Sequence, residues 1–289
     1  MKKTLLITAG LVVAGVVGFY LAYAFSRSVP TSAQYPDSYT YNLLFKPGAW
    51  LIPIMAFLGI FLRAIRKPAE DESPLKEGKV LRHDAHMFLS HWSHMVAVLF
   101  LMVSGLAMGP LWLERLVHTP EASGFALNLH FIGVIVFAFA FCYFVTDLIL
   151  KRAFKELLPG PRDITDAVIY YTSKIGIGQK PEQGKYLASE KLAFPLWVVF
   201  LGGLIITGGF KVAAHLWTYS SDFMGTVTHL HDVCALALLV LVAIHVLLGS
   251  LVPWAWPLLK SMVTGYMNEE YVRENHALWL KDIESDAKG

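Results

Sequence analysis

The residues with the clearest potential for chemistry are histidines, and two of them lie in one predicted helix over about 227–251. His231 and His245 lie 14 residues apart. In an α-helix this spacing is a rotation of about 1400°, roughly 40° short of four full turns, so both imidazoles point to one face. The rise is roughly 21 Å, which places one imidazole near each surface of a membrane. Because imidazole ligates haem iron from facing helices of a bundle, the spacing indicates two haems stacked across a membrane.

Each of these histidines needs a partner at its own depth on another helix. His91 and His94 lie early in an uncharged stretch that begins on the side of the membrane where His245 lies. His130 lies at the start of the following stretch, at the depth of His231. From geometry alone, His91 or His94 pairs with His245, and His130 pairs with His231. His94 is either the inner ligand or a hydrogen-bond donor beside it.

A histidine within a membrane span can also serve only as a hydrogen-bonding group between helices. We prefer ligation because four histidines agree in depth and face. His229 lies 16 residues from His245 and so faces the opposite side, and we interpret it as interfacial. The other histidines lie at or beyond helix ends, where solvent or lipid headgroups account for them (His83, His86, His118, His215 and His276).

The elements that must hold these residues are membrane-spanning helices. The 289 residues are 55% hydrophobic and only 16% charged, whereas soluble domains are roughly a quarter charged. Five of six long uncharged stretches reach the length of about 18 residues that spans a bilayer; the six are 4–26, 47–62, 85–113, 122–146, 192–210 and 233–259. The second reaches it only across Lys46 or past Arg63. This composition excludes a soluble enzyme and a disordered chain, and the apolar runs disfavour a β-barrel.

We therefore predict six transmembrane helices, over about 4–25, 47–65, 87–109, 126–150, 191–214 and 227–251. If the N-terminus is cytoplasmic and the helices alternate, 20 of the 24 Lys and Arg residues lie on the cytoplasmic side. This asymmetry follows the positive-inside rule and predicts that both ends of the chain are cytoplasmic. The first helix also has features of a secretory signal, with Lys2 and Lys3 before it and a small-residue motif at 22–24.

The chain is expected to have two parts. Residues 1–80 form an N-terminal helix pair with a cytoplasmic linker over 68–74, and residues 81–289 form the histidine-bearing core with a cytoplasmic tail. The tail after Lys260 mixes apolar and charged residues and is expected to lie along the membrane surface. Cys142 and Cys234 lie in apolar runs, and no C-x-x-C or C-x-x-C-H motif occurs, which excludes an iron–sulfur cluster and a c-type haem attachment.

Residues 80–289 resemble the γ subunit of membrane-bound respiratory formate dehydrogenase, a di-haem cytochrome b. The resemblance is carried by motifs that occur in order: Ser90-His91-Trp92, Ser104-Gly105-Leu106, Leu129-His130 with Gly133, Gly184-Lys185-Tyr186 with Glu190-Lys191, Ile206-Thr207-Gly208, and the tail segments 263–265 and 276–279. The intervals of 39 residues from His91 to His130 and 14 from His231 to His245 are also similar to those of the family.

The resemblance implies an all-α integral membrane protein with a four-helix di-haem core and two additional N-terminal helices. It implies His91 and His245 as ligands of a cytoplasmic-side haem b, and His130 and His231 as ligands of a periplasmic-side haem b. The complex would lie in the bacterial cytoplasmic (inner) membrane. A periplasmic molybdopterin (Mo or W) subunit oxidises formate, and an iron–sulfur subunit passes the electrons on to quinone (menaquinone or ubiquinone) through the haems. The formate site therefore belongs to another chain.

Two departures from the family pattern matter. The quinone segment of the family carries Asn and Gly where this chain has Leu187 and Ser189. Leucine cannot hydrogen-bond to a quinone head, so Ser189, Tyr186 or Glu190 are the candidates for that contact, and a plain surface loop is the alternative. In addition, many γ subunits lack helices corresponding to residues 1–80, which could dock another subunit, bind lipid or only insert the chain.

Other functions fit the same pattern less specifically. The b subunits of hydrogenase and of thiosulfate or polysulfide reductase share the design, and the sequence fixes neither the donor nor the direction of electron flow. A transporter that moves protons through histidines belongs to a different class. Transporters place ion sites near the midplane on broken helices, whereas Asp147 and Asp232 lie near helix ends. The expected partners are the iron–sulfur subunit, the molybdopterin subunit, quinone and the lipid bilayer. No nucleic acid is expected as a partner.

Overall fold

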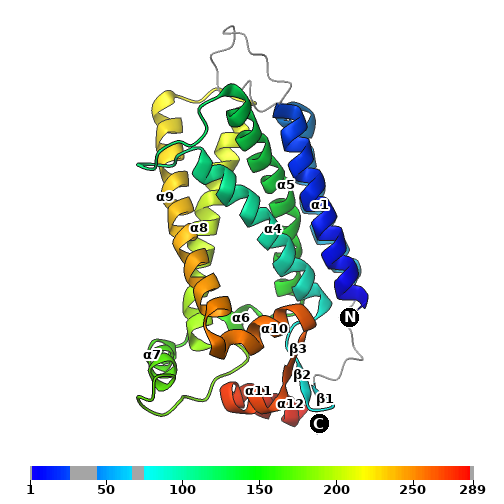
Figure 1. Ribbon diagram of the computed structural model, residues 1–289, viewed down its shortest axis with the longest axis vertical. Helices are drawn as coiled ribbons and strands as arrows, with labels where there is room; N and C mark the ends of the chain where they lie inside the picture. Colours follow the sequence, from blue (N-terminus) through cyan, green and yellow to red (C-terminus); the bar gives the residue numbers. More distant parts are fainter. Residues whose placement is uncertain (1, 27–43, 67–74, 287–289) are drawn as a thin grey trace. The chain divides into compact units, whose positions relative to one another are not determined.

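The computed structural model describes residues 2–26, 44–66 and 75–286, and these are mostly helical (Figure 1). Within them, five helices are long and apolar enough to cross a membrane: Leu5–Ser26, Ala85–Ala107, Pro120–Leu150, Ala188–Ala213 and Ser221–Leu251. The chain is therefore a largely α-helical integral membrane protein, as predicted. The predicted linker over 68–74 and most of the loop over 26–46 lie outside the described residues.

The second predicted span is shorter than expected. A single turn, α2 (Phe45–Gly48), is followed by a separate helix, α3 (Leu51–Ile65). Pro53 lies in the first turn of α3, where its missing N–H costs no hydrogen bond. With 15 residues, α3 is below the length that spans a bilayer unaided, so a count of six membrane spans stays a prediction.

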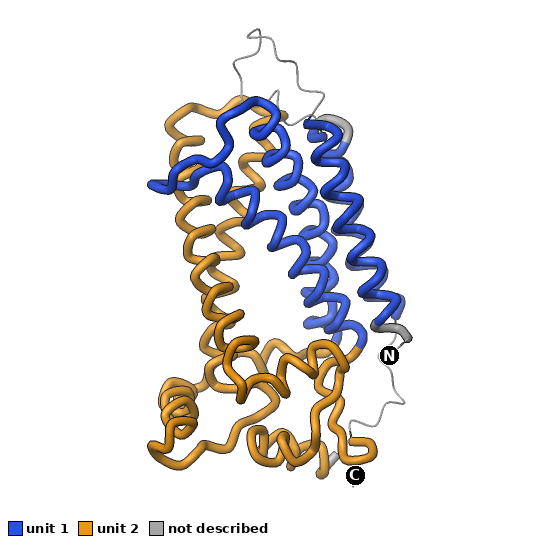
Figure 2. The backbone as a smooth tube through the Cα atoms, in the orientation of Figure 1, with its two compact units in different colours: residues 1–68, 85–150 blue, residues 69–84, 151–289 orange. Residues whose placement is uncertain are grey.

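The first compact unit comprises residues 1–68 and 85–150 (Figure 2). Its central helix is α5 (Pro120–Leu150), and α1 (Lys2–Ser26), α3 and α4 (Ala85–Ala107) all pack against it. Gly59 lets α3 approach α5 closely, since a Cβ there would lie 2.5 Å from the Phe139 carbonyl oxygen. Helices α1 and α3 therefore belong to the same compact unit as α4 and α5, and the division of the chain at residue 80 stays a prediction.

The second compact unit comprises residues 69–84 and 151–289. Its long helices are α8 (Ala188–Ala213) and α9 (Ser221–Val246), which pack against each other. A Cβ on Gly203 would lie 2.6 Å from the Sγ atom of Cys234, so the glycine allows this close approach. Two short helices, α6 (Phe154–Leu157) and α7 (Asp163–Ser173), precede α8, and a π-turn over Leu247–Leu251 ends α9.

The tail of the chain forms a small folded lobe with the segment before α4, and this lobe contains a short sheet that the sequence did not predict. Its sheet is antiparallel in the order β1 (Leu75–Lys76), β2 (Lys79–Leu81), β3 (Tyr266–Asn268). The lobe also contains α10 (Trp256–Thr264), α11 (Glu269–Asn275) and α12 (Ala277–Asp286). Val80 is opposite Met267 in the register, and both lie in an apolar core with Val272, Leu280 and Ile283. Part of the apolar content of the tail thus builds a core of its own, and the position of the tail along the membrane surface stays a prediction.

Candidate functional site

The structure places all five candidate ligand histidines on long apolar helices. His91 and His94 lie on α4, His130 lies on α5, and His231 and His245 lie on α9. Because α9 is α-helical from Ser221 to Val246, its two histidines share one face at a separation of roughly 21 Å along the axis. The prediction that they belong to a single helix is confirmed.

His130 is held by a hydroxyl group from the neighbouring helix of its own unit. Its Nδ1 atom lies 3.0 Å from Oγ of Ser104 on α4. The same Oγ lies 2.5 Å from the carbonyl oxygen of Phe100, which can only accept a hydrogen bond. A hydroxyl has one hydrogen, and Ser104 donates it to this carbonyl, so Nδ1–H of His130 is the donor to Oγ. The Nε2 atom of His130 therefore keeps its lone pair and can ligate a metal.

His231 repeats this arrangement in the other unit. Its Nδ1 atom lies 2.9 Å from Oγ1 of Thr207 on α8, and that Oγ1 lies 2.6 Å from the carbonyl oxygen of Gly203. The threonine hydrogen goes to the carbonyl, so His231 donates from Nδ1 and keeps a lone pair on Nε2. Both predicted ligands of the outer haem thus have the tautomer that coordination through Nε2 requires.

A glycine follows each of these hydroxyl residues. A Cβ built on Gly105 would lie 3.8 Å from Cε1 of His130, and one built on Gly208 would lie 3.6 Å from Cε1 of His231. The Cε1 atom lies between Nδ1 and Nε2 in the ring, so each glycine lies beside its imidazole at a distance of ordinary van der Waals contact. Two imidazoles in the tautomer that presents Nε2 to iron are a donor set that fits a b-type haem.

The histidines predicted for the inner haem have aromatic neighbours. The His94 Nδ1 atom donates to the carbonyl oxygen of Ser90 at 2.8 Å, which again leaves Nε2 with a lone pair. His91 makes an edge contact with Trp92, and His245 makes one with Trp197. The geometric alternative between His91 and His94 thus stays open, and the choice of His91 rests on the Ser90-His91-Trp92 motif.

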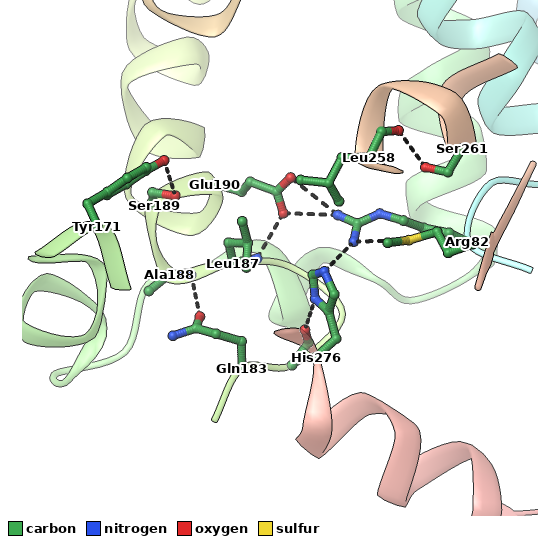
Figure 3. A network of polar contacts seen from close by, with 12 residues as sticks. Arg82, Tyr171, Gln183, Leu187, Ala188, Ser189, Glu190, Leu258, Ser261 and His276 are labelled. Atoms are coloured by element: carbon green, nitrogen blue, oxygen red, sulfur yellow. Dashed lines mark hydrogen bonds and ion pairs between the residues drawn. The ribbon is translucent and has the colours of Figure 1, made fainter. Parts of the chain in front are cut away.

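The predicted quinone segment forms the N-terminal cap of α8. The Glu190 carboxylate accepts hydrogen bonds from the backbone N–H of Leu187 at 2.8 Å and from Nη2 of Arg82 at 3.2 Å. Ser189 accepts a hydrogen bond from the Tyr171 hydroxyl at 3.2 Å, as Figure 3 shows. Ser189 and Glu190 therefore have partners within the protein, and quinone contact by Ser189 or Tyr186 stays a prediction.

His276 corrects one expectation of the sequence analysis, because it is completely buried and not at a solvated helix end. Its Nδ1 atom donates to the carbonyl oxygen of Gly184 at 2.8 Å, and its Nε2 atom accepts from Nη1 of Arg82 at 3.1 Å (Figure 3). Arg82 thereby joins the tail to the cap of α8. Neither role was predicted, although His276 lies in the tail motif that carries part of the resemblance.

The stability of this lobe should depend on pH. Burial, followed by the charge of Arg82, lowers the pKa of His276 from 6.5 to about 3. Below pH 6.5 His276 is protonated in the unfolded chain but stays neutral in the folded lobe. The free energy of unfolding should therefore fall by up to about 1.4 kcal/mol per pH unit between pH 6.5 and about 3. Thermal unfolding of the purified protein at a series of pH values measures this slope. His276→Asn, which retains an acceptor and a donor, should reduce the slope; an unchanged slope would contradict the assignment.

Residues 82–265 match the family described as prokaryotic cytochrome b561. The chain belongs to this family. The match covers more than half of the chain and contains α4, α5, α8 and α9 with the five candidate ligands. This cytochrome is therefore a membrane protein that binds b-type haem and takes part in electron transfer. No match was found among curated proteins.

Proposed function

We propose that this cytochrome carries electrons through two b haems, from the iron–sulfur subunit of a formate dehydrogenase-type complex to quinone. The observation that carries the proposal is the position of His231 and His245 on one face of a single uninterrupted helix. One such helix with two partner helices can supply bis-imidazole ligation at two depths. The helices that bear His91 and His130 are the partners the sequence assigns.

The proposed ligands are His130 and His231 for the outer haem and His91 and His245 for the inner haem. Haem b, when bound, supplies a one-electron carrier whose potential the protein adjusts. This chain supplies the imidazoles from apolar helices and holds His130 and His231 in the Nδ1–H tautomer. The role of the protein is therefore to position two redox centres at a separation that permits transfer across the bilayer.

The proposed partners follow from the ordered motifs over residues 80–289. A periplasmic molybdopterin subunit would oxidise formate, and an iron–sulfur subunit would deliver the electrons near His130 and His231. Quinone would be reduced near His245 on the cytoplasmic side, where Tyr186 and Ser189 are the candidate contacts. The excess of Lys and Arg in alternate loops supports an orientation with both ends of the chain in the cytoplasm, and the resemblance implies the inner membrane.

The purified full-length chain tests the haem half of this proposal. We expect two b haems per polypeptide, measured as pyridine haemochrome against protein concentration, and two redox transitions in a titration of the reduced-minus-oxidised spectrum. A single haem in well-folded protein would contradict the two-centre assignment.

The complex isolated from native membranes through a tag on this chain tests the donor half. Formate should reduce its haems, and added quinone should reoxidise them. Haem reduction by hydrogen, and not by formate, would support the hydrogenase alternative. It would not contradict the proposal that this chain binds two b haems. Haem oxidation by thiosulfate or polysulfide would support a reductase complex in the same way.

A further inference from the structure

We propose that Ser104 and Thr207 are positioning residues that strengthen electron donation by His130 and His231. They thereby lower the reduction potential of the outer haem and leave that of the inner haem unchanged. This inference rests on the proposed function, because it takes those two histidines as the ligands of one haem. It concerns hydroxyl groups that touch neither iron nor substrate and act only through the imidazoles.

The same device occurs twice, in two separate helix pairs. Ser104 on α4 accepts from Nδ1 of His130 on α5 at 3.0 Å, and Thr207 on α8 accepts from Nδ1 of His231 on α9 at 2.9 Å. Both hydroxyl residues are buried, with exposed fractions of 1% and 7%. Each hydroxyl hydrogen is committed to the carbonyl oxygen four residues earlier in its own helix.

A serine or threonine hydroxyl bonded to the preceding turn is common in membrane helices and by itself only satisfies the hydroxyl. Here the bond has a further consequence, because it turns the remaining lone pairs of the oxygen toward a neighbouring imidazole. The acceptor lies on a different helix from the histidine, so the contact fixes both the tautomer and the rotation of the ring. A structural role alone would not require an imidazole as the second partner of both hydroxyls.

An acceptor at Nδ1–H makes the imidazole a stronger electron donor at Nε2. Stronger donation stabilises ferric over ferrous iron and lowers the potential of the haem. In a buried site of low dielectric constant this hydrogen bond is stronger than it would be in water. Removal of either hydroxyl should therefore shift the potential of the outer haem upward, and removal of both should shift it further.

The experiment compares Ser104→Ala, Thr207→Val and the double variant in the full-length haem-loaded protein. We expect the transition that disappears in His231→Ala to move to higher potential, by about 59 mV for each tenfold loss of preference for the ferric state. The other transition should stay in place, and the iron–histidine signals in resonance Raman or electron paramagnetic resonance spectra should change with the first. The substitutions Ser104→Thr and Thr207→Ser keep a hydroxyl group, so these variants should have the same potential as the original protein.

Thr146→Val is the matched control, because the Thr146 hydroxyl makes the same bond to the carbonyl oxygen of Cys142 within α5. It should move neither potential. Unchanged potentials and spectra in both hydroxyl-deletion variants would overturn the inference. An equal shift in the variants that keep a hydroxyl group would also overturn it. If His130→Ala and His231→Ala themselves retain both haems, the proposed function has failed, which is a different result from failure of the positioning role.

Discussion

Substitution of His231 by alanine should remove one of two haems and stop electron transfer from the periplasmic partner. Methyl cannot replace imidazole as an axial ligand, so a haem that depends on two protein ligands should be lost when one of them is missing. His130→Ala should produce the same loss, because the two histidines are the proposed pair. Haem content per polypeptide and reduction of the remaining haem by the physiological donor measure the outcome.

The inner pair should behave differently. His245→Ala and His91→Ala should each remove the inner haem. The outer haem should stay reducible, and quinone reduction should stop. The contrast depends on the order of the two centres, since an electron that reaches the outer haem has no further carrier. Unchanged haem content in all four variants would show that the ligand assignment is wrong.

Two neighbouring histidines serve as controls for this series. His229 is exposed and lies on the opposite side of α9 from His245, so His229→Ala should retain both haems. His94→Ala should also retain both if His91 is the inner ligand. Loss of the inner haem in His94→Ala, with retention in His91→Ala, would exchange their roles.

Most of the membrane architecture could be predicted because a bilayer leaves few choices. Every backbone polar group in lipid must be satisfied internally, so a long uncharged run has to be a helix. Five of the six predicted spans agree with long apolar helices of the structure: Leu5–Ser26, Ala85–Ala107, Pro120–Leu150, Ala188–Ala213 and Ser221–Leu251. The break before α3 was missed because hydropathy does not register a local turn.

The lobe and its contacts could not be predicted from local pattern. Its strands have two or three residues, and Val80 pairs with Met267, far along the chain. A short strand has almost no periodic signal, and its partner becomes apparent only in the folded chain. His276 was misjudged for the same reason, since its burial is created by the lobe and not by a membrane helix.

Ser104 and Thr207 illustrate an intermediate case. Both belong to short sequence motifs, Ser-Gly and Thr-Gly. Their roles depend on contacts with histidines 26 and 24 residues away. Sequence could indicate that the motifs belong to the core, but the direction of each hydroxyl hydrogen required the distances to the carbonyls of the preceding turn.

The second large effect concerns the buried ion pair that joins α3 to α5. Arg63 Nε lies 2.6 Å from Asp147 Oδ1, and both side chains are almost completely buried. Arg63→Ala would leave the Asp147 carboxylate without the guanidinium in an apolar environment. Loss of one partner of a buried pair typically costs about 3–5 kcal/mol, so we expect a large fall in stability. Thermal unfolding followed through the haem absorption measures it.

The double variant Arg63→Leu with Asp147→Leu tests the cause of that loss. Replacement of a whole buried pair by apolar residues is often neutral, so the double variant should recover most of the stability that Arg63→Ala loses. Lys151→Ala is the comparison, because the pair of Lys151 with Asp84 is about a third exposed and should contribute less than about 1 kcal/mol. Equal losses in Arg63→Ala and Lys151→Ala would contradict this account. Because Asp147 shares α5 with His130, the expected result would make α3 an integral part of the unit that holds a haem ligand.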